Sequence, residues 1–543
     1  MALQDNTIQH IIDLKSEDEN NRDNPKFKGV LLSNRDISEV VFGVRSSEST
    51  VRRVWKKYKQ QGHYQGVVGD NPIAGGTVET PDVKRKVLSG KKFVITSAQN
   101  NTYVHTDFLK SLEVYCEEEG AELLISCFYY NKNGFQNGKR EGAWFDDRIK
   151  PYLVNESVQL AKGLVFCGEM NILPTAVNPI SGLHNYTGEN SCILPHAKLQ
   201  MESVPTPKHE PSRMIYTTGC TTLLNYVPMK SGLKAAYHHT YAALVVEVDS
   251  EGDWFVRQLN CESKTGQFYD LGNYYTPKGK TSGHNIEAVN YGDLHGISIA
   301  PEVEYACWEG KGNILDTLKP KYQFLHDSMS NERRNHHNLR CPLYMFTQHT
   351  SNAECVREEV ELTTNLIAKL DRPYSERVVV DSNHDRSIQR WILEQDFKKD
   401  PVNAIFMLEL TLDLFKATRD GLDFHTFENA CRRVDPRMNT VRFLRQDESF
   451  KICGKIECGA HSDTGNNGGR GSVMAFQRAG LLFNIGHSHQ ATIKDGVFQS
   501  GMSGNLEQGY NKGNSSWNHS HILTYPNGKR TIVTQKGSKW RGL

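Results

Sequence analysis

The sequence predicts an α/β protein built from several domains. At 543 residues the chain is too long for one hydrophobic core, so two to four domains are expected. From about residue 91 onward, apolar runs typical of strands alternate with amphipathic segments typical of helices. In the second half, five short clusters of Asp, Asn and His each directly follow an apolar run. This placement predicts strands whose ends carry the chemistry.

The composition is that of an ordinary soluble globular protein. The net charge is +1, 23% of the residues are charged, and no apolar stretch approaches the ~20 residues that span a bilayer. The segment 1–25 is polar and acidic, without the basic start or apolar run of a secretory signal. The 12 cysteines form no Cys-x-x-Cys pair, which indicates reduced thiols. We therefore expect a cytoplasmic protein without a membrane segment.

The first 62 residues predict a small DNA-binding unit. Residues 1–25 are expected to be disordered or loosely attached. Within 26–62, one helix begins at Ser33 with a capping signal and stops at Gly43, and a second begins near Thr50. Helix, short turn and helix resemble a helix-turn-helix, whose second helix enters the major groove of DNA. The side chains expected to contact DNA are Arg52, Arg53, Lys56 and Lys57.

The local charge favours contact with a polyanion. Residues 51–92 contain ten Lys or Arg against three Asp or Glu, so this stretch carries +7 in a nearly neutral chain. Two alternatives stay open. The charges could belong to a solvated surface, and the helices could merely pack on their neighbours.

Residues 63–90 are rich in Gly and Pro and predict a linker, and 91–282 predict a mixed α/β domain. A strand at 93–95, a helix at 106–119 and a strand at 123–126 indicate a βαβ unit, and 242–259 indicate a β-hairpin. The first strand ends at Ser97-Ala98-Gln99-Asn100, where a metal-binding turn would need Asp and His. We assign no catalysis to this domain, and DNA contact, self-association and scaffolding stay open.

The chemistry is expected in residues 286–543. Most of the clusters follow a predicted strand, and ligands in layered α/β folds bind beyond the carboxyl ends of the strands, so residues distant in sequence should share one rim. Together the clusters hold enough oxygen and imidazole donors for two adjacent divalent cations, an arrangement that cleaves phosphoesters. They are Gly292-Asp293-Leu294-His295-Gly296, His326-Asp327, Ser382-Asn383-His384-Asp385, Ala460-His461-Ser462 and Gly486-His487-Ser488-His489.

The order of these clusters resembles the calcineurin-like metallophosphoesterase superfamily over about 286–530. That superfamily carries Asp-x-His, Gly-Asp, Gly-Asn-His-Asp/Glu, a lone His and Gly-His-x-His in this order. The resemblance implies a layered α/β/β/α sandwich for 286–543. Two positions differ, because His326 and Ser382 stand where the superfamily has glycine. Since both glycines favour tight turns, Asp327, which follows His326, is the least secure ligand.

The resemblance also implies a role for each residue. His384 would act on the transition state or the leaving group without binding metal, and Asp385 would orient its ring. Asp381 and His326 are interpreted as polar groups at strand ends, with support of the metal ligands as the alternative. The His-rich donor set favours Mn²⁺, with Fe²⁺ or Zn²⁺ as alternatives and Mg²⁺ less natural. The implied ligands are Asp293, His295 and His489 for the first metal, Asn383, His461 and His487 for the second, and Asp327 as the bridge between them.

A glycine-rich loop, residues 463–471, follows His461 and contains Arg470. Its backbone could approach a phosphate chain closely, with Arg470 as a further DNA contact. A mobile surface loop is the equal alternative.

The leading functional hypothesis is a two-metal DNA nuclease to which the basic helix-turn-helix delivers duplex. The combination resembles a family of pre-early DNA-degradation and DNA-transfer proteins of tequintavirus-type phages. That resemblance implies degradation of host DNA in the bacterial cytoplasm, a role in phage DNA transfer, and contact with DNA. Self-association and contact with other early phage proteins stay open.

Two alternatives are kept. One is a monoesterase or cyclic-nucleotide diesterase that acts on small substrates. The other is a DNA-binding regulator with a vestigial metal site, which the intact set of motif residues disfavours.

Overall fold

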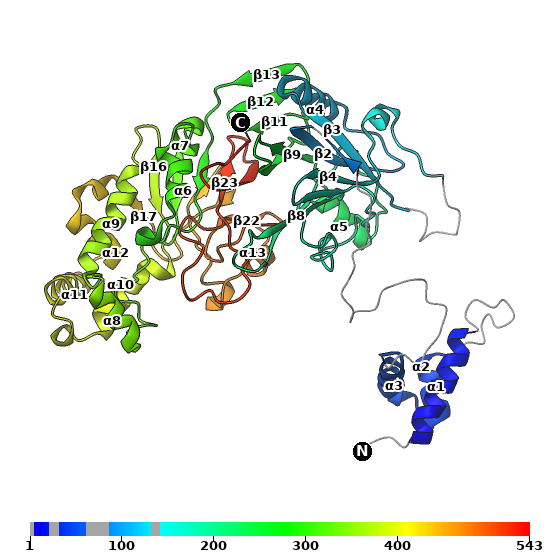
Figure 1. Cartoon of the computed structure of the whole chain (residues 1–543), viewed down its shortest axis with the longest axis horizontal. Helices are drawn as coiled ribbons and strands as arrows, with labels where there is room; N and C mark the ends of the chain where they lie inside the picture. The colour runs from blue at the N-terminus through cyan, green and yellow to red at the C-terminus, as the bar shows by residue number, and fades with distance from the viewer. Residues whose placement is uncertain (1–4, 21–31, 61–85, 89, 132–141, 543) are drawn as a thin grey trace. The chain divides into compact units, whose positions relative to one another are not determined.

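The computed structural model describes residues 5–20, 32–60, 86–88, 90–131 and 142–542. The chain divides into two compact units, Met1–Asp82 and Val83–Leu543 (Figure 1). Together their described residues form a mixed α/β fold with 13 α-helices and four sheets. No helix in the described ranges is long and apolar enough to cross a bilayer. Most of the predicted linker, 63–90, lies outside the described residues.

The first unit contains three helices, α1 (Asp5–Asn20), α2 (Asn34–Phe42) and α3 (Glu48–Gln60). The predicted start of α2 is confirmed, because Ser33 Oγ accepts from the Asp36 N–H and Asp36 accepts from the Ser33 N–H. Gly43 ends α2 with a φ of 69°, in the left-handed region that favours glycine. The pair of helices predicted over 26–62 is therefore present. Its core consists of Ile11, Ile12, Ile37, Val51, Val54 and Trp55.

The N-terminal segment differs from the expectation of disorder over 1–25. Residues 5–20 form α1, and Ile11 and Ile12 are buried in the core of the first unit. The apolar side chains of Ile8, Ile11 and Ile12 have the i, i+3, i+4 spacing of one helix face. The polar composition of the segment hides this narrow apolar face.

The second unit begins with a four-stranded sheet in the order β10-β9-β2-β3. The predicted βαβ unit is confirmed by β2, α4 and a parallel β3, and the predicted hairpin by β9 and an antiparallel β10. Helix α4 packs on one face of the sheet through Phe108, Leu109 and Leu112. The bounds are β2 Lys92–Gln99, α4 Thr106–Glu119, β3 Glu122–Phe128, β9 Ala242–Val248 and β10 Trp254–Asn260.

A six-stranded sheet in the order β17-β16-β15-β14-β23-β24 lies beside the first. Strand β10 runs alongside β24, where the Gln258 N–H donates to Thr531 Oγ1 at 2.9 Å. Strands β14 to β17 are parallel, so their carboxyl ends meet at one edge. The bounds are β14 Ala288–Asn290, β15 Tyr322–Leu325, β16 Glu376–Val379, β17 Arg442–Phe443, β23 Ser520–Thr524 and β24 Arg530–Thr534.

The third sheet has 11 strands, in the order β1-β4-β5-β6-β8-β7-β21-β22-β20-β19-β18. Strands from both sides of residue 285 are therefore hydrogen-bonded in one sheet, and a boundary between domains at 282–286 stays a prediction. The bounds are β1 Lys86–Val87, β4 Ser157–Ala161, β5 Leu164–Cys167, β6 Ser191–Leu194, β7 Met201–Val204, β8 Arg213–Thr217, β18 Lys451–Ile452, β19 Ile456–Glu457, β20 Leu482–Ile485, β21 Thr492–Lys494 and β22 Val497–Gln499.

This sheet repeats one strand order about its centre. Outward from the antiparallel pair β7 and β21, the order is β7-β8-β6-β5-β4 on one side and β21-β22-β20-β19-β18 on the other. Both series run antiparallel, parallel, parallel, antiparallel. The other two sheets match in the same way, since β3-β2-β9-β10 has the directions of β15-β14-β23-β24. The second unit therefore consists of two lobes of one topology. The first lobe contains β1 to β10, and the second lobe contains β14 to β24. The second lobe adds β16, β17 and several helices.

The second lobe has a layered core. Helices pack on one face of the six-stranded sheet through residues such as Val360, Trp391 and Phe427. The other face of this sheet packs on β18 and β19 through Phe324, Val378 and Ile456. The helix bounds are α6 Pro301–Glu304, α7 Ile314–Leu318, α8 Pro342–Thr350, α9 Val356–Lys369, α10 Asn383–Glu394, α11 Ala404–Arg419, α12 Thr426–Val434 and α13 Val473–Arg478, with α5 Lys230–His238 in the first lobe. The fourth sheet is small and lies between the two lobes in the sequence. Its three strands are β11 Phe268–Asp270, β12 Asn273–Thr276 and β13 Gly279–Ser282.

Candidate metal centre

All five clusters predicted from the sequence meet at one edge of the second lobe. Asp293 and His295 follow β14, and Asp327 follows β15. Asn383 begins α10, shortly after the last residue of β16, Val379. His461 follows β19, and the pair His487 and His489 follows β20. The parallel strands explain this convergence, because their carboxyl ends point the same way. The seven predicted ligands are therefore brought together.

The first predicted metal position is formed by Asp293, His295 and His489. His489 Nε2 lies 3.2 Å from Asp293 Oδ2 and 3.1 Å from His295 Nε2. With Asp327, these three residues can present one donor atom each within 4.8 Å of one another, and all four are buried. This spacing suits a single cation.

The second predicted position is formed by Asn383, His461 and His487. His461 Nε2 lies 3.2 Å from Asn383 Oδ1 and 3.1 Å from Asp327 Oδ2. His461, His487 and Asp327 form a second group with donor atoms within 4.8 Å. Asp327 belongs to both groups, which is the location that a bridging carboxylate requires.

His326 lies inside the site, although the sequence was interpreted as placing a strand-end polar group there. Its ring is fully buried, and its Nδ1 lies 3.4 Å from His461 Nδ1. It also forms a possible ligand group with Asp293 and His461. The signal for this role was present in the sequence, because a histidine stands where the resembled superfamily has glycine.

The replacement of both superfamily glycines is compatible with the turns. The left-handed residue after β15 is Asp327 itself, with a φ of 42°, and not His326. Ser382 is extended and caps α10, where its Oγ accepts from the Asp385 N–H. His295, His487 and His489 also have positive φ values, of 50°, 75° and 58°. Such backbone strain in residues other than glycine concentrates at functional sites.

Burial and charge shift the pKa values of the donors in opposite directions. Burial lowers the pKa of His295 to about 3 and that of His326 to about 4, so both rings are neutral and able to bind metal. Burial opposes the charge of His461, but the carboxylate of Asp327 outweighs it and raises the pKa of His461 to about 9. Burial alone would raise the pKa of the partner carboxylate, Asp327. The charges of His461 and His384 outweigh burial, so the pKa of Asp327 falls well below its usual range.

The buried donors present could hold metal ions. Asp293 Oδ1 and His326 Nε2 are buried, and no described residue hydrogen-bonds to them. Unsatisfied buried carboxylate and imidazole atoms are costly unless a ligand completes them. The number of ions and the preference for Mn²⁺ stay predictions.

His384 lies at the open side of the centre, half-buried, with its ring 4.7 Å from that of His295. Its backbone N–H donates to Asp327 Oδ1 at 3.3 Å, and its Nδ1 lies 2.9 Å from the Ser330 carbonyl oxygen. The contact with the Ser330 carbonyl fixes one ring nitrogen of His384 beside the candidate ligands.

The hydrogen bonds of Asp385 go to the loop after β15 and not to the ring of His384, so the predicted orientation of that ring could act only through this loop. Its carboxylate is buried and accepts from the backbone N–H groups of Ser328 and Met329. Because the same loop supplies the Ser330 carbonyl, Asp385 positions His384 through the backbone. Glu359 supports the loop farther along, where it accepts from the N–H groups of Glu332 and Arg333.

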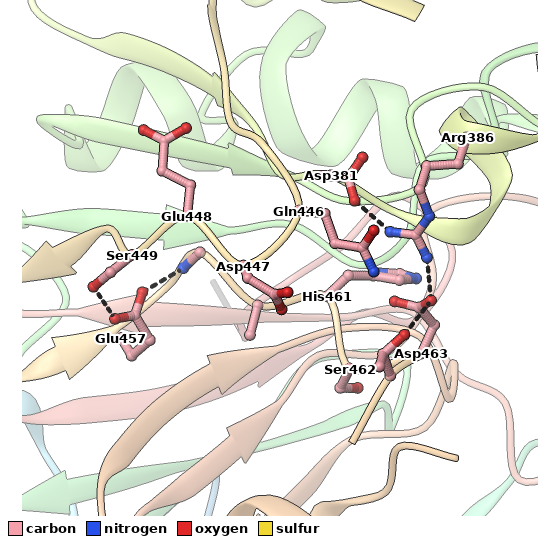
Figure 2. A pocket seen from close by; sticks show the side chains of 13 residues that line it. Asp381, Arg386, Gln446, Asp447, Glu448, Ser449, Glu457, His461, Ser462 and Asp463 are labelled. Atoms are coloured by element: carbon pink, nitrogen blue, oxygen red, sulfur yellow. Dashed lines mark hydrogen bonds and ion pairs between the residues drawn. The ribbon is translucent and has the colours of Figure 1, made fainter. Parts of the chain in front are cut away.

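An acidic pocket of about 230 Å³ opens beside His461 (Figure 2). Arg386 lies between Asp381 and Asp463 and pairs with both. The other acidic residues that line it are Asp447, Glu448 and Glu457. One arginine among five carboxylates makes this side of the centre unfavourable for a polyanion.

Two of these donors have no counterpart at the matching positions of the first lobe that the structure describes. The Ser503 N–H donates to the Asp293 carbonyl, and in the first lobe the Thr221 N–H donates to the Ser97 carbonyl. Ser97 and Gln99 therefore stand where the second lobe has Asp293 and His295. In the described part of the first lobe, the one group able to hold a metal is the turn Asp249, Glu251 and Asp253. That residues 91–282 carry no catalysis stays a prediction.

The predicted DNA contacts lie in two places. Arg52, Arg53 and Lys56 are exposed on α3, and the side chain of Lys57 lies outside the described residues. Arg470 is exposed in a tight loop, where the Gly465 N–H donates to the Gly469 carbonyl. Their contact with DNA stays a prediction.

Manganese is expected to raise the melting temperature more at about pH 8.5 than at pH 6.5. In the metal-free protein the pKa of His461 is raised from 6.5 to about 9, so its pairing with Asp327 stabilises the fold fully below 6.5 and is lost through 9. A metal must displace that proton, so affinity falls about tenfold per pH unit below 9. Thermal melts with and without excess Mn²⁺ at both pH values test this. An equal or larger shift at pH 6.5 would contradict it.

Comparison with known proteins gives one result that bears on identity. No protein-family model matches the chain, and no solved structure matches it. The chain is similar to Protein A1 of Escherichia phage T5, with 40% identity over 484 residues, which cover 87% of this chain and 86% of that protein. The chain therefore belongs to the family of the phage T5 protein named Protein A1.

Proposed function

We propose that the protein is a two-metal-dependent phosphodiesterase that cleaves DNA. The observation that carries the proposal is the convergence of seven predicted ligands into two groups that share Asp327. When bound, a pair of cations about 3.5–4 Å apart would neutralise the phosphate and lower the pKa of a bound water. A buried donor set of this kind is compatible with a metal-dependent phage enzyme.

The residues around the ions divide the remaining work. Asp293, His295 and His489 would hold one ion, and Asn383, His461 and His487 would hold the other, with Asp327 between them. His384 would donate a proton to the leaving oxygen or stabilise charge on the phosphate. The Ser330 carbonyl, held by Asp385 and Glu359, would keep the His384 ring in place.

The layered core supports a calcineurin-like sandwich for the second lobe. Helices, the six-stranded sheet and the strands β18 to β22 follow one another, with α13 packed beside β22. We propose this fold on the layering together with the order of the clusters. The domain limits 26–62, 91–282 and 286–543 are part of the same proposal.

The first unit favours DNA over a small substrate. Its paired helices present Arg52, Arg53 and Lys56 at the surface of the second helix, the position that enters the major groove in helix-turn-helix proteins. In a phage protein family, a DNA-cutting enzyme would act on host DNA in the bacterial cytoplasm. A role in phage DNA transfer belongs to this proposal.

Two substrates in parallel test the proposed function. Linear duplex DNA with Mn²⁺ should be degraded, and p-nitrophenyl phosphate should be hydrolysed slowly or not at all. Chelation by EDTA should stop DNA loss, and renewed Mn²⁺ should restore it. Hydrolysis of the small ester alone would favour the monoesterase alternative. DNA binding without cleavage of either substrate would favour a regulator with a vestigial site.

Replacing Arg52, Arg53 and Lys56 together by alanine is expected to weaken DNA binding and its salt dependence. Each phosphate contact removed should reduce the slope of log K against log salt by about 0.9. Fluorescence anisotropy at several salt concentrations measures the slope, in EDTA to prevent cleavage. Gln9→Ala, on the exposed part of α1, is the matched control. An unchanged slope would show that α3 does not contact the phosphates.

A further inference from the structure

Two aromatic side chains stand at the edge of the metal centre, on the segment between β22 and β23. The ring of Trp517 meets that of His489 edge-on, with 4.3 Å between centroids and 80° between planes. Tyr510 packs against Trp517 at 5.7 Å and 67°. The aromatic pair, Tyr510 and Trp517, therefore extends outward from a predicted metal ligand.

Tyr510, the outer member of the pair, is accessible to solvent. It is 59% exposed, so a large part of the residue can meet a ligand. Burial of the remainder, together with the carboxylates of Asp327 and Asp293, raises the pKa of its phenol above the ordinary value.

The segment that carries the aromatic pair is anchored at several points. Ser515 and Thr206 exchange backbone hydrogen bonds of 3.0 and 2.8 Å, and the Asn505 N–H donates to the Ser298 carbonyl at 2.7 Å. These contacts link the segment to both lobes, since Thr206 follows β7 of the first lobe. An anchored ring loses little conformational entropy when a ligand stacks on it.

Two lysines lie near the aromatic pair. Lys208 Nζ lies 3.4 Å from Asn511 Oδ1, next to Tyr510 in sequence, and Lys512 is exposed one residue farther on, while Glu507 on the same segment carries the opposite charge. The pocket beside His461 is acidic by contrast, with five carboxylates and one arginine. The side of His489 is therefore less acidic than the side of His461, and it is the less unfavourable approach for a nucleic acid strand.

We propose that Tyr510, supported by Trp517, forms a nucleobase-stacking subsite beside the metal centre. The base next to the scissile phosphate leaves its neighbours and stacks on the Tyr510 ring, while Lys208 and Lys512 contact flanking phosphates. This inference rests on the proposed cleavage of DNA and specifies how the strand is held. Stacking on an aromatic side chain tolerates any base sequence, as degradation of a whole genome requires.

A matched pair of single-stranded oligonucleotides tests the subsite with full-length protein and Mn²⁺. One carries ordinary nucleotides throughout. In the other, the nucleotides on both sides of one chosen stretch of phosphodiester bonds are replaced by tetrahydrofuran abasic residues. For cleavage within this stretch, the wild-type protein should have a kcat/KM that is roughly tenfold higher for the ordinary oligonucleotide than for the abasic one. Tyr510→Ala should reduce this ratio to near one, and Tyr510→Phe should keep it. Tyr237→Ala removes a tyrosine that is 79% exposed on α5 and should change nothing.

The outcomes separate the subsite from the proposed function. If the wild-type protein degrades linear duplex DNA but cuts neither oligonucleotide, the subsite is overturned and the proposed function stands. If it also leaves duplex DNA intact, the proposed DNA cleavage is overturned and the subsite with it. If it cuts both equally well, the subsite alone is overturned. If Tyr510→Ala slows both substrates by the same factor and the ratio persists, the ring supports the centre without contacting a base, which also overturns the proposal.

Discussion

Replacing Asp327 by asparagine is expected to lower kcat/KM for DNA cleavage by at least a thousandfold. Asp327 belongs to both ligand groups, and the substitution removes one negative charge from between two cations while leaving the shape of the side chain nearly unchanged. A neutral amide cannot replace a carboxylate that bridges two ions, so both metal affinity and water activation should fall. Single-turnover cleavage rates and metal content by elemental analysis measure the two effects.

The control for this variant is Asp316→Asn in the same lobe. Asp316 pairs with Arg372 away from the centre, so its replacement should leave the metal content and the cleavage rate nearly unchanged. Wild-type activity in Asp327→Asn would show that the bridging position does not carry the reaction. Loss of activity in both variants would point to folding instead of chemistry.

Replacing His384 by alanine is expected to reduce cleavage by about a hundredfold to ten-thousandfold while both metals stay bound. A general acid contributes this range, and the His384 side chain belongs to neither predicted ligand set. The effect should be smaller for a p-nitrophenyl diester than for DNA, because nitrophenolate leaves without protonation. Comparing the two rates in the variant therefore tests the role of His384 as well as its importance.

His337→Ala is the matched control, because His337 is an exposed histidine of the same lobe. It should retain full activity. A fall in metal content in His384→Ala equal to its fall in activity would contradict the proton-transfer role and identify His384 as a ligand.

The convergence of the site could be predicted because it depends on local patterns. Asp293, Asp327 and Asn383 each follow a strand of a parallel sheet, and parallel strands bring their ends together whatever the separation along the chain. The βαβ unit and the hairpin were predictable for the same reason, since the periodicity of a few residues specifies them.

Features that depend on long-range pairing could not be predicted in this way. The role of His326 requires the approach of His461 from another sheet, at 3.4 Å. Asp385 was assigned to the ring beside it in sequence, but its partners lie on the loop after β15. The repeat of strand order was also hidden, because Ser97 and Gln99 preserve the backbone of the Asp293 turn without its side chains.

The two lobes that share the central sheet are arranged like the two subunits of a dimer, but they belong to one chain. Two separate subunits would dissociate on dilution and could exchange partners, whereas lobes on one polypeptide keep a constant one-to-one ratio. The second lobe carries the candidate metal ligands, whereas the first lobe has Ser97 and Gln99 at two of the matching positions. Each molecule should accordingly carry a single reaction centre, even though its architecture has room for two.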